Sequence, residues 1–179
     1  MQGGSGKKDS GYYILLMFLR KGREISIGRK GEGRFFPRGW YAYAGSARRG
    51  LSKRIERHLA KNKKMHWHID YLLESVEIRR VFVIPDPGLS LRNATFPPEG
   101  GGGAPLPFEC CLADTLAHLP GAQRFFPRFG SGDCFCPGHL SHLRSNPGKA
   151  ILRLDKFEVV TWEKYARAIT GGCNPEGLS

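Results

Sequence analysis

The sequence has no long hydrophobic run, because its 179 residues contain no apolar stretch of about 18, the length that crosses a membrane. Near the N-terminus it also lacks the apolar segment and small-residue cleavage site of a signal peptide. Its five cysteines are few and odd in number, which argues against a secreted disulfide framework. We therefore predict a single-domain, cytoplasmic protein with no membrane partner.

Negative charge is scarce: 16 Asp and Glu residues face 28 Lys and Arg residues, a formal net charge of +12. Such a surplus attracts polyanions, although it does not distinguish DNA, RNA, acidic partners or a basic surface without a ligand. Many of the basic residues follow Tyr43 closely, from Arg48 to Lys64. This clustering predicts a phosphate-facing surface on and just beyond one helix.

Three segments lack residues that could pack into a core. Residues 1–10 and 171–179 are predicted to be tails, the first of them disordered. Residues 85–107 hold a Gly- and Pro-rich surface insert that is predicted to be mobile. The domain itself is predicted to span residues 11–170.

Strand patterns dominate the first part of this domain. Residues 12–19 and 24–27 flank a Gly-containing turn, which predicts a β-hairpin, and residues 40–44 follow as a third strand. Further along, short strands are expected over residues 81–84 and 150–160.

Apolar residues recur at helical spacing in four segments. Leu51, Ile55 and Leu59 lie four residues apart and predict a helix whose apolar stripe faces the core. Arg54 and His58 are also four apart, so they are neighbours on an adjoining face. Further helices are predicted over residues 68–76, 108–119 and 161–170.

The first strand, the third strand and the following helix carry residues suited to phosphodiester hydrolysis. That reaction needs an activated water, charge stabilisation at phosphorus, and a metal or proton donor at the leaving oxygen. Tyr13 and Tyr43 can act as bases only if their pKa of about 10 is lowered. Arg54 can pair with phosphate oxygens, and a later carboxylate can hold a metal. Alternatively, the tyrosines are ordinary strand aromatics.

These residues resemble a known family. The triplets GYY at residues 11–13 and YAG at residues 43–45 look like the two halves of the signature of the GIY-YIG nucleases. Residues 43–59, YAGSARRGLSKRIERHL, are similar to that family's core block. The phrases FPRGWYAYAGSA, KKMHWHIDYLL, ECCLA and FGSGDCFC resemble the GIY-YIG-like group called DUF123, whose members occur alone or fused to endonuclease III-type DNA glycosylases. The resemblance runs from residue 11 to about residue 142.

The resemblance implies an α+β fold with a small three-stranded antiparallel sheet flanked by helices. It also implies cleavage of DNA, favoured over RNA, with one Mg²⁺ or Mn²⁺ ion and a DNA-repair enzyme as a partner. Tyr13 and Tyr43 match the signature tyrosines, and Arg54 matches the catalytic arginine. Glu109 is the best match to the glutamate that binds the metal, unless it only favours a helix N-terminus. His58 lines the same face as a proton or phosphate contact.

Two departures from the family keep a second hypothesis open. The linker between the two signature halves, residues 14–42, is longer than is usual in the family, and no Asn follows Glu109 in the family's context. The alternative is a catalytically silent DNA- or RNA-binding module that accompanies repair enzymes.

A basic and aromatic segment follows the first predicted helix. Basic residues interleaved with Trp67 are typical of a nucleic-acid-binding edge, where the ring stacks on bases and lysines contact phosphates. Alternatively, Asp70 or His68 caps a helix and Trp67 fills the core. The predicted nucleic-acid contacts are Ser46, Lys53, Arg57, Lys63, Lys64, His66, Trp67 and His68.

Cysteine and histidine gather late in the chain, at Cys134, Cys136, His139 and His142, after an earlier Cys110 and Cys111. Four such ligands can form a tetrahedral zinc site, as in a zinc-stabilised interaction protein. Only one residue separates Cys134 from Cys136, whereas two to four residues usually separate paired zinc cysteines. This spacing favours buried free thiols.

Overall fold

The computed structural model describes residues 9–28, 31, 33–86, 95–96, 106–124, 127–132, 134–154 and 157–170. Within these residues the chain forms a six-stranded antiparallel sheet, two separate two-stranded ribbons and five helices. The predicted α+β class is confirmed, but the main sheet has six strands instead of the predicted three. No helix in the described part of the chain is long and apolar enough to cross a membrane.

The main sheet is built around β1 (Gly11–Leu19), which pairs with β4 (Gly39–Ala47) on one side and β5 (Glu77–Pro85) on the other. The strand order is β10-β5-β1-β4-β9-β8. The outer strands are β8 (Ala122–Arg124), β9 (Leu140–Leu143) and β10 (Val160–Thr161). Strand β1 is therefore the centre of the fold.

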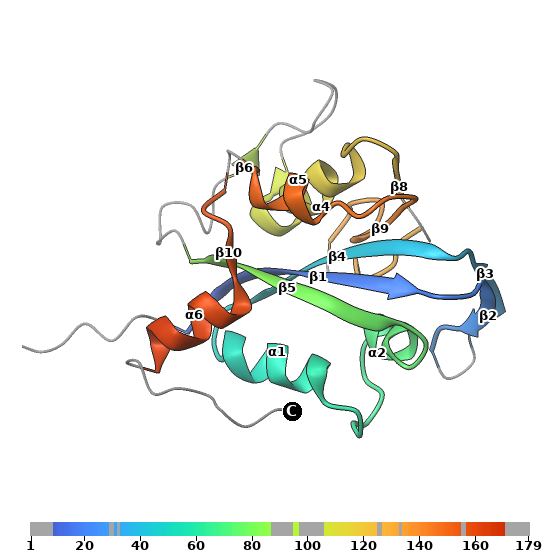
Figure 1. The fold of residues 1–179 in the computed structure, drawn as a ribbon, viewed down its shortest axis with the longest axis horizontal. Coiled ribbons are helices and arrows are strands. Elements are labelled where there is room, and N and C mark those ends of the chain that lie inside the picture. The colour runs from blue at the N-terminus through green and yellow to red at the C-terminus, as the bar shows by residue number, and fades with distance from the viewer. Residues whose placement is uncertain are drawn as a thin grey trace, which may run out of the picture.

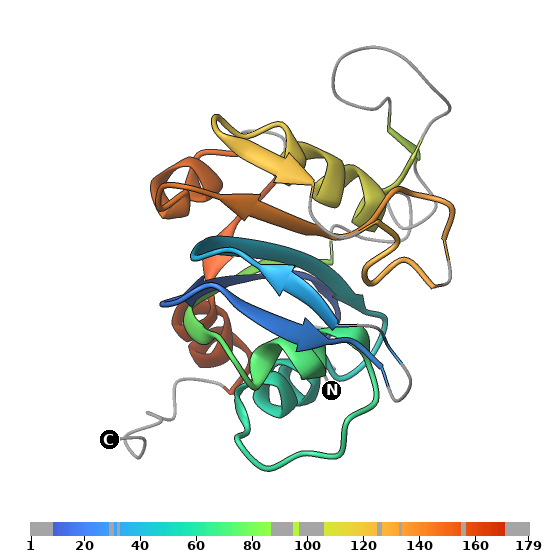
Figure 2. The same cartoon turned by 90° about the vertical axis from the view of Figure 1, so that its right-hand side faces the viewer.

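Helices cover both faces of this sheet (Figure 1). On one side lie α1 (Leu51–Leu59), α2 (His68–Leu73) and α6 (Trp162–Ile169). On the other side lie α4 (Phe108–Ala117) and α5 (Gly148–Leu152). Figure 2 shows these layers from the side, with the loop that leads into β9 beside α4.

The apolar sequence of β1 follows from this sandwich. Side chains alternate between the two faces of a strand. Tyr13, Leu15 and Met17 enter the core beneath α1 and α2, whereas Ile14 and Leu16 enter the core beneath α4. Because both faces are covered, the strand is apolar at nearly every position.

The hairpin predicted from residues 12–19 and 24–27 is wrong. Strand β2 (Arg23–Ser26) pairs with β3 (Gly33–Phe36) in a ribbon separate from the main sheet. The four-residue β2 is mostly exposed, whereas β4 pairs with all nine residues of β1 and is apolar on both faces. The long linker between the two signature halves holds this ribbon.

The strand predicted over residues 150–160 is also wrong, because Ala150 and Ile151 lie in α5 and only Val160 enters a strand. Ile151 is fully buried in the core beneath α4, so the apolar residues of this segment pack as one face of a short helix. The other predicted strands and helices are present with shifted ends, and α2 ends earlier, at Leu73. In the predicted insert, β6 (Thr95–Phe96) pairs with β7 (Leu106–Pro107). Most other residues of the insert lie outside the described part of the chain.

Residues 1–8 and 171–179, predicted as tails, lie outside the described residues. Asp9 and Ser10, placed in the first tail by sequence, make defined contacts. The Asp9 carboxylate accepts hydrogen bonds from the backbone N–H and the hydroxyl of Ser52, at 2.9 and 2.6 Å. It thereby caps the first turn of α1, whose own N-cap residue is Gly50.

Candidate functional site

One open cleft of about 120 Å³ is lined by polar side chains from four elements. Strand β1 supplies Tyr13, β4 supplies Tyr43 and Ser46, α1 supplies Arg54 and His58, and α4 supplies Glu109. Trp67, Ile69 and Gly130 complete the lining. The structure thus brings together all five residues predicted for catalysis, although Glu109 is 51 or more positions from the others.

Two glycines make room for the tyrosine rings in this cleft. Gly45 lies opposite Tyr13 in the β1–β4 register, and a Cβ at this position would overlap the Tyr13 ring. Gly130 has a φ of +73°, and a Cβ there would lie 2.7 Å from Cε2 of Tyr43. The ring centroids of Tyr13 and Tyr43 lie 6.4 Å apart. The glycine of the second triplet therefore permits the close approach of the two tyrosines.

Tyr13 and His58 form a buried hydrogen-bonded pair. The Tyr13 hydroxyl oxygen lies 2.8 Å from Nε2 of His58. Burial lowers the pKa of His58 to about 4, with the nearby cations adding to this effect, so its imidazole is neutral at pH 7. Burial raises the pKa of Tyr13 above its ordinary value despite the neighbouring Arg54. At neutral pH, the pair therefore consists of a protonated phenol and a neutral imidazole joined by a hydrogen bond.

Arg54 is held at the wall of the cleft by two contacts. Its Nη1 donates to the backbone carbonyl of Ser46 at 2.9 Å, and its guanidinium lies 4.8 Å from the centre of the Trp67 ring. Arg54 takes part in none of the salt bridges between the described residues. The half-buried cation is thus positioned for an anion that enters the cleft.

Glu109 is the one carboxylate among the residues that line the cleft. Its Oε2 accepts a hydrogen bond from the Ser46 hydroxyl at 2.5 Å, and its Oε1 lies 3.5 Å from Nδ1 of His139. Mg²⁺ in phosphate-processing sites is held by one or two carboxylates together with waters and substrate phosphates. A single half-buried carboxylate fits such a hydrated ion, and does not fit a cage made of protein ligands alone.

Arg57, predicted as a nucleic-acid contact, forms a two-pronged ion pair with Asp70. Its Nη1 and Nη2 each lie 2.9 Å from one oxygen of this fully buried carboxylate. Asp70 also accepts the backbone N–H groups of His66 and Trp67, and so caps the start of α2. Burial alone would raise the pKa of Asp70, but these bonds lower it to about 2. The capping alternative therefore holds for Asp70.

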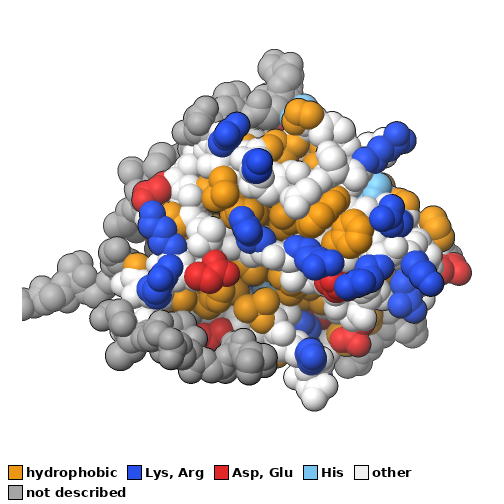
Figure 3. Space-filling model, viewed as in Figure 1, with side chains coloured by type: hydrophobic (Ala, Val, Ile, Leu, Met, Phe, Trp, Pro, Cys, Tyr) orange, Lys and Arg blue, Asp and Glu red, His pale blue; other side chains and the backbone are white. Residues whose placement is uncertain are grey.

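The other predicted nucleic-acid contacts are dispersed. The Lys63 ammonium donates to the carbonyls of His58 and Ala60 at the end of α1. Trp67 is half-buried against the core, with Arg54 and Arg57 on its ring. Four of the predicted contacts have exposed side chains that lie outside the cleft lining: Lys53, Lys64, His66 and His68. Basic side chains are spread across the face shown in Figure 3, so the basic surface extends beyond α1.

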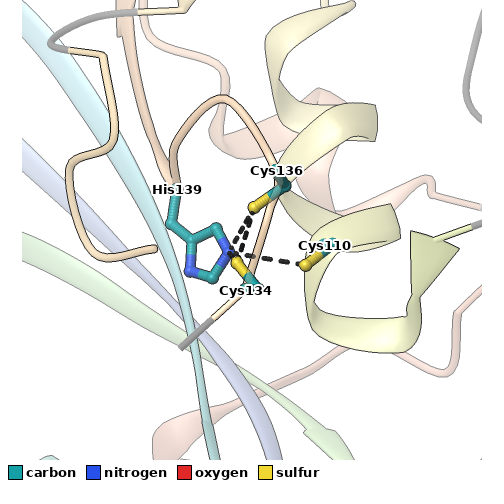
Figure 4. Close-up of side chains that lie close together, drawn as sticks. All are labelled: Cys110, Cys134, Cys136 and His139. Carbon is teal, nitrogen blue, oxygen red and sulfur yellow. Dashed lines mark hydrogen bonds between the residues drawn. The ribbon is translucent and has the colours of Figure 1, made fainter. Parts of the chain in front are cut away.

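A second cluster lies next to this cleft, where Cys110 of α4 meets Cys134, Cys136 and His139 of the loop before β9 (Figure 4). The sequence placed His142 in this set, but its Nε2 faces the Arg38 carbonyl and its ring lies against Tyr41. Successive helix residues point about 100° apart, so only one of Cys110 and Cys111 can face the loop. Cys111 points instead into the core between α4 and the sheet.

Comparison with known proteins gives a match for one part of the chain. A search of curated proteins found no match, and a search of solved structures found none. The part that matches runs from the second residue of β1 to beyond the end of β5, and it contains every residue of the cleft lining except Glu109 and Gly130. This part, residues 12–92, matches the family model described as domain of unknown function DUF123.

Proposed function

We propose that this chain is a metal-dependent endonuclease of the GIY-YIG type that hydrolyses DNA phosphodiester bonds. The observation that carries the proposal is the convergence of the Tyr13–His58 pair, Tyr43, Arg54 and Glu109 on one cleft from four separate elements. Hydrolysis of a phosphodiester requires a proton acceptor, a fixed cation and a metal ligand within one site. This cleft contains a candidate for each of the three.

The Tyr13–His58 pair supplies a route for the proton of the attacking water. When the water gives its proton to the Tyr13 oxygen, the phenolic proton moves to Nε2 of His58, 2.8 Å away. The raised pKa of Tyr13 supports this relay over a standing phenolate. Tyr43 lines the same cleft and is proposed to orient the water.

Arg54 is the group proposed to stabilise the charge that develops on the phosphoryl oxygens. Its guanidinium is held by the Ser46 carbonyl and the Trp67 ring, so little reorganisation is needed when substrate arrives. Planar guanidinium can pair with two phosphate oxygens at once, which an ammonium group cannot do with the same geometry.

Glu109, assisted by the Ser46 hydroxyl, would hold the divalent ion, Mg²⁺ or Mn²⁺. When bound, such an ion supplies Lewis-acid stabilisation of the phosphate and of the leaving oxygen. The Ser46 hydroxyl restricts one carboxylate oxygen, and His139 faces the other. DNA as the substrate, and a DNA-repair enzyme as a partner, belong to the same proposal because they follow from the family resemblance.

The test is incubation of the full chain with plasmid, hairpin and single-stranded DNA in Mg²⁺ or Mn²⁺. We expect cleavage by the wild type and loss of cleavage in Arg54→Ala and Glu109→Ala. Lys164→Ala is the control, since Lys164 is an exposed cation on α6, outside both the cleft lining and the predicted nucleic-acid contacts. Cleavage that is unchanged in Arg54→Ala and Glu109→Ala would contradict the assignment.

A second function, a catalytically silent nucleic-acid-binding module, is favoured by one observation. The cleft offers a single carboxylate to a metal, and that carboxylate is already hydrogen-bonded to Ser46. This function predicts binding that weakens steeply as salt concentration rises, without cleavage in any divalent metal.

A further inference from the structure

We infer that Cys110, Cys134, Cys136 and His139 form a structural zinc site. The four ligand atoms, three Sγ and the His139 Nε2, all lie within 4.8 Å of one another. At usual Zn–S and Zn–N bond lengths, the corners of a tetrahedron are about 3.6 to 3.8 Å apart. The distances from Nε2 to Cys134 and Cys110, 3.5 and 3.7 Å, match this separation. The Cys136 Sγ lies nearer, at 3.0 Å from both Nε2 and the Cys134 Sγ, so a bound ion would move this one sulfur outward by about 0.6 to 0.8 Å.

The contacts around Nε2 are those of ligands that share a cation. Three sulfur atoms from two separate segments point at this one nitrogen (Figure 4). A neutral imidazole nitrogen has one lone pair and can accept one hydrogen, so three thiols cannot all be satisfied by it. A metal ion in the centre satisfies all four groups together.

The donor set selects zinc and a structural role. Three thiolates and an imidazole suit Zn²⁺, whereas Mg²⁺ prefers oxygen ligands. All four positions are taken by protein atoms, and Cys110, Cys136 and His139 are buried. A closed, buried Cys₃His set is typical of zinc sites that hold a fold together, because a catalytic zinc keeps one position open.

Neighbouring contacts orient the histidine for this purpose. With Nε2 toward the sulfur atoms, Nδ1 of His139 faces Oε1 of Glu109 at 3.5 Å. A carboxylate behind a zinc-bound histidine fixes the tautomer and the ring orientation. Glu109 therefore lies between the zinc site and the cleft, and contacts a residue of each.

The zinc site holds one wall of the cleft. The loop that carries three of the ligands also carries Phe129 and Gly130, which pack against the ring of Tyr43. Cys110 belongs to α4, so a bound ion ties this loop to the helix that begins with Phe108 and Glu109. Because the site would be absent from an unfolded chain, the binding energy of the metal adds to folding stability.

The test is the metal content of the full chain, purified in reductant without a metal-affinity tag and dialysed against metal-free buffer. We expect one zinc per chain, and loss of zinc in Cys110→Ser and Cys136→Ser. The matched controls are Cys111→Ser, a buried neighbour outside the cluster, and His142→Gln, the ligand that the sequence suggested. Both controls should retain zinc.

Exchange of the metal for Co²⁺ gives a second readout that needs no variant. We expect the strong thiolate charge-transfer and tetrahedral ligand-field absorption of a cobalt ion with cysteine ligands. Wild-type protein that contains no zinc and gives no such spectrum in Co²⁺ would overturn the inference, as would zinc retained in Cys136→Ser or a disulfide between Cys134 and Cys136. Neither readout depends on DNA cleavage, so this inference and the proposed nuclease function can fail separately.

Discussion

The Tyr13 hydroxyl and Nε2 of His58 lie 2.8 Å apart, and each residue is 2% exposed. The two residues are separated by 45 positions, on β1 and α1. Burial keeps the phenol protonated and the imidazole neutral, so the pair carries no charge at neutral pH. A neutral imidazole with its proton on Nδ1 can take the phenolic proton at Nε2, as the proposed relay requires.

The pair should therefore act as a single unit in DNA cleavage. We predict that Tyr13→Phe and His58→Gln each lower the cleavage rate by about 10²- to 10⁴-fold, the range for one acid–base group. The double variant should be little slower than the slower single variant, since either change breaks the same relay. Single-turnover rates measure this, with thermal unfolding as the check on folding. Losses that multiply in the double variant would show that the two groups act independently.

His58 should also make stability depend on pH. Its pKa is about 4 in the folded chain and about 6.5 in an unfolded one, so the unfolded state binds more protons between these values. The free energy of unfolding should fall as pH falls from about 6.5 to about 4, by at most about 3 kcal/mol. Urea unfolding at a series of pH values measures this loss. In His58→Gln the pH dependence in this window should be reduced, and an unchanged slope would contradict the assignment.

The ionised Asp70 carboxylate should stabilise the fold at neutral pH and lose this effect in acid. With its pKa lowered to about 2, its contribution is complete above the unfolded value of about 3.9 and is lost as pH falls through about 2. Asp70→Asn should lower the free energy of unfolding by about 3 kcal/mol at pH 7, because it breaks a pair whose carboxylate is fully buried. Glu74→Gln, an exposed carboxylate at the end of α2, is the control and should change stability little. Equal effects of the two substitutions would show that the buried pair has no special weight.

Substitution of Glu109 should affect Mg²⁺-dependent cleavage and zinc binding to different degrees. Glu109→Gln removes the one carboxylate of the cleft lining but none of the four zinc ligands. We predict loss of Mg²⁺-dependent cleavage with one zinc still bound per chain. Zinc affinity should fall by about 10- to 100-fold, the usual cost of removing a carboxylate behind a histidine ligand. Metal content and cleavage of the same sample test both parts, and complete loss of zinc would make Glu109 part of the zinc site itself.

The strand and helix patterns were predictable where the sequence pattern was local. Residues 51–59 form the expected helix, but the buried position in its last turn is His58, whereas Leu59 is 43% exposed. A histidine counts as polar in a periodicity argument, and its burial depends on Tyr13, which is far away in sequence. The strands β1 and β2 were both predicted, but their partners were not, because the pairing of β1 depends on β4 and β5 covering both its edges.

The candidate catalytic residues of the cleft were predictable because the family resemblance fixes residue types at many positions around them, whereas Ile69 and Gly130 were not predicted as part of the site. The basic residues were harder, since a sequence does not show which cations are already used. Arg57 is paired with Asp70, and Lys63 with backbone carbonyls at the end of α1. Cys110 was likewise missed as a partner of Cys134, because 24 positions and a separate element lie between them.

The cleavage of supercoiled plasmid in Mg²⁺, measured together with DNA binding on the same samples, tests the nuclease assignment most directly. We predict that the wild type and Lys164→Ala nick the plasmid, and that Arg54→Ala binds DNA with a similar dependence on salt but cleaves it about 10²- to 10³-fold more slowly. Salt-dependent binding by the wild type with no strand scission in either Mg²⁺ or Mn²⁺ would contradict the assignment and identify a silent binding module.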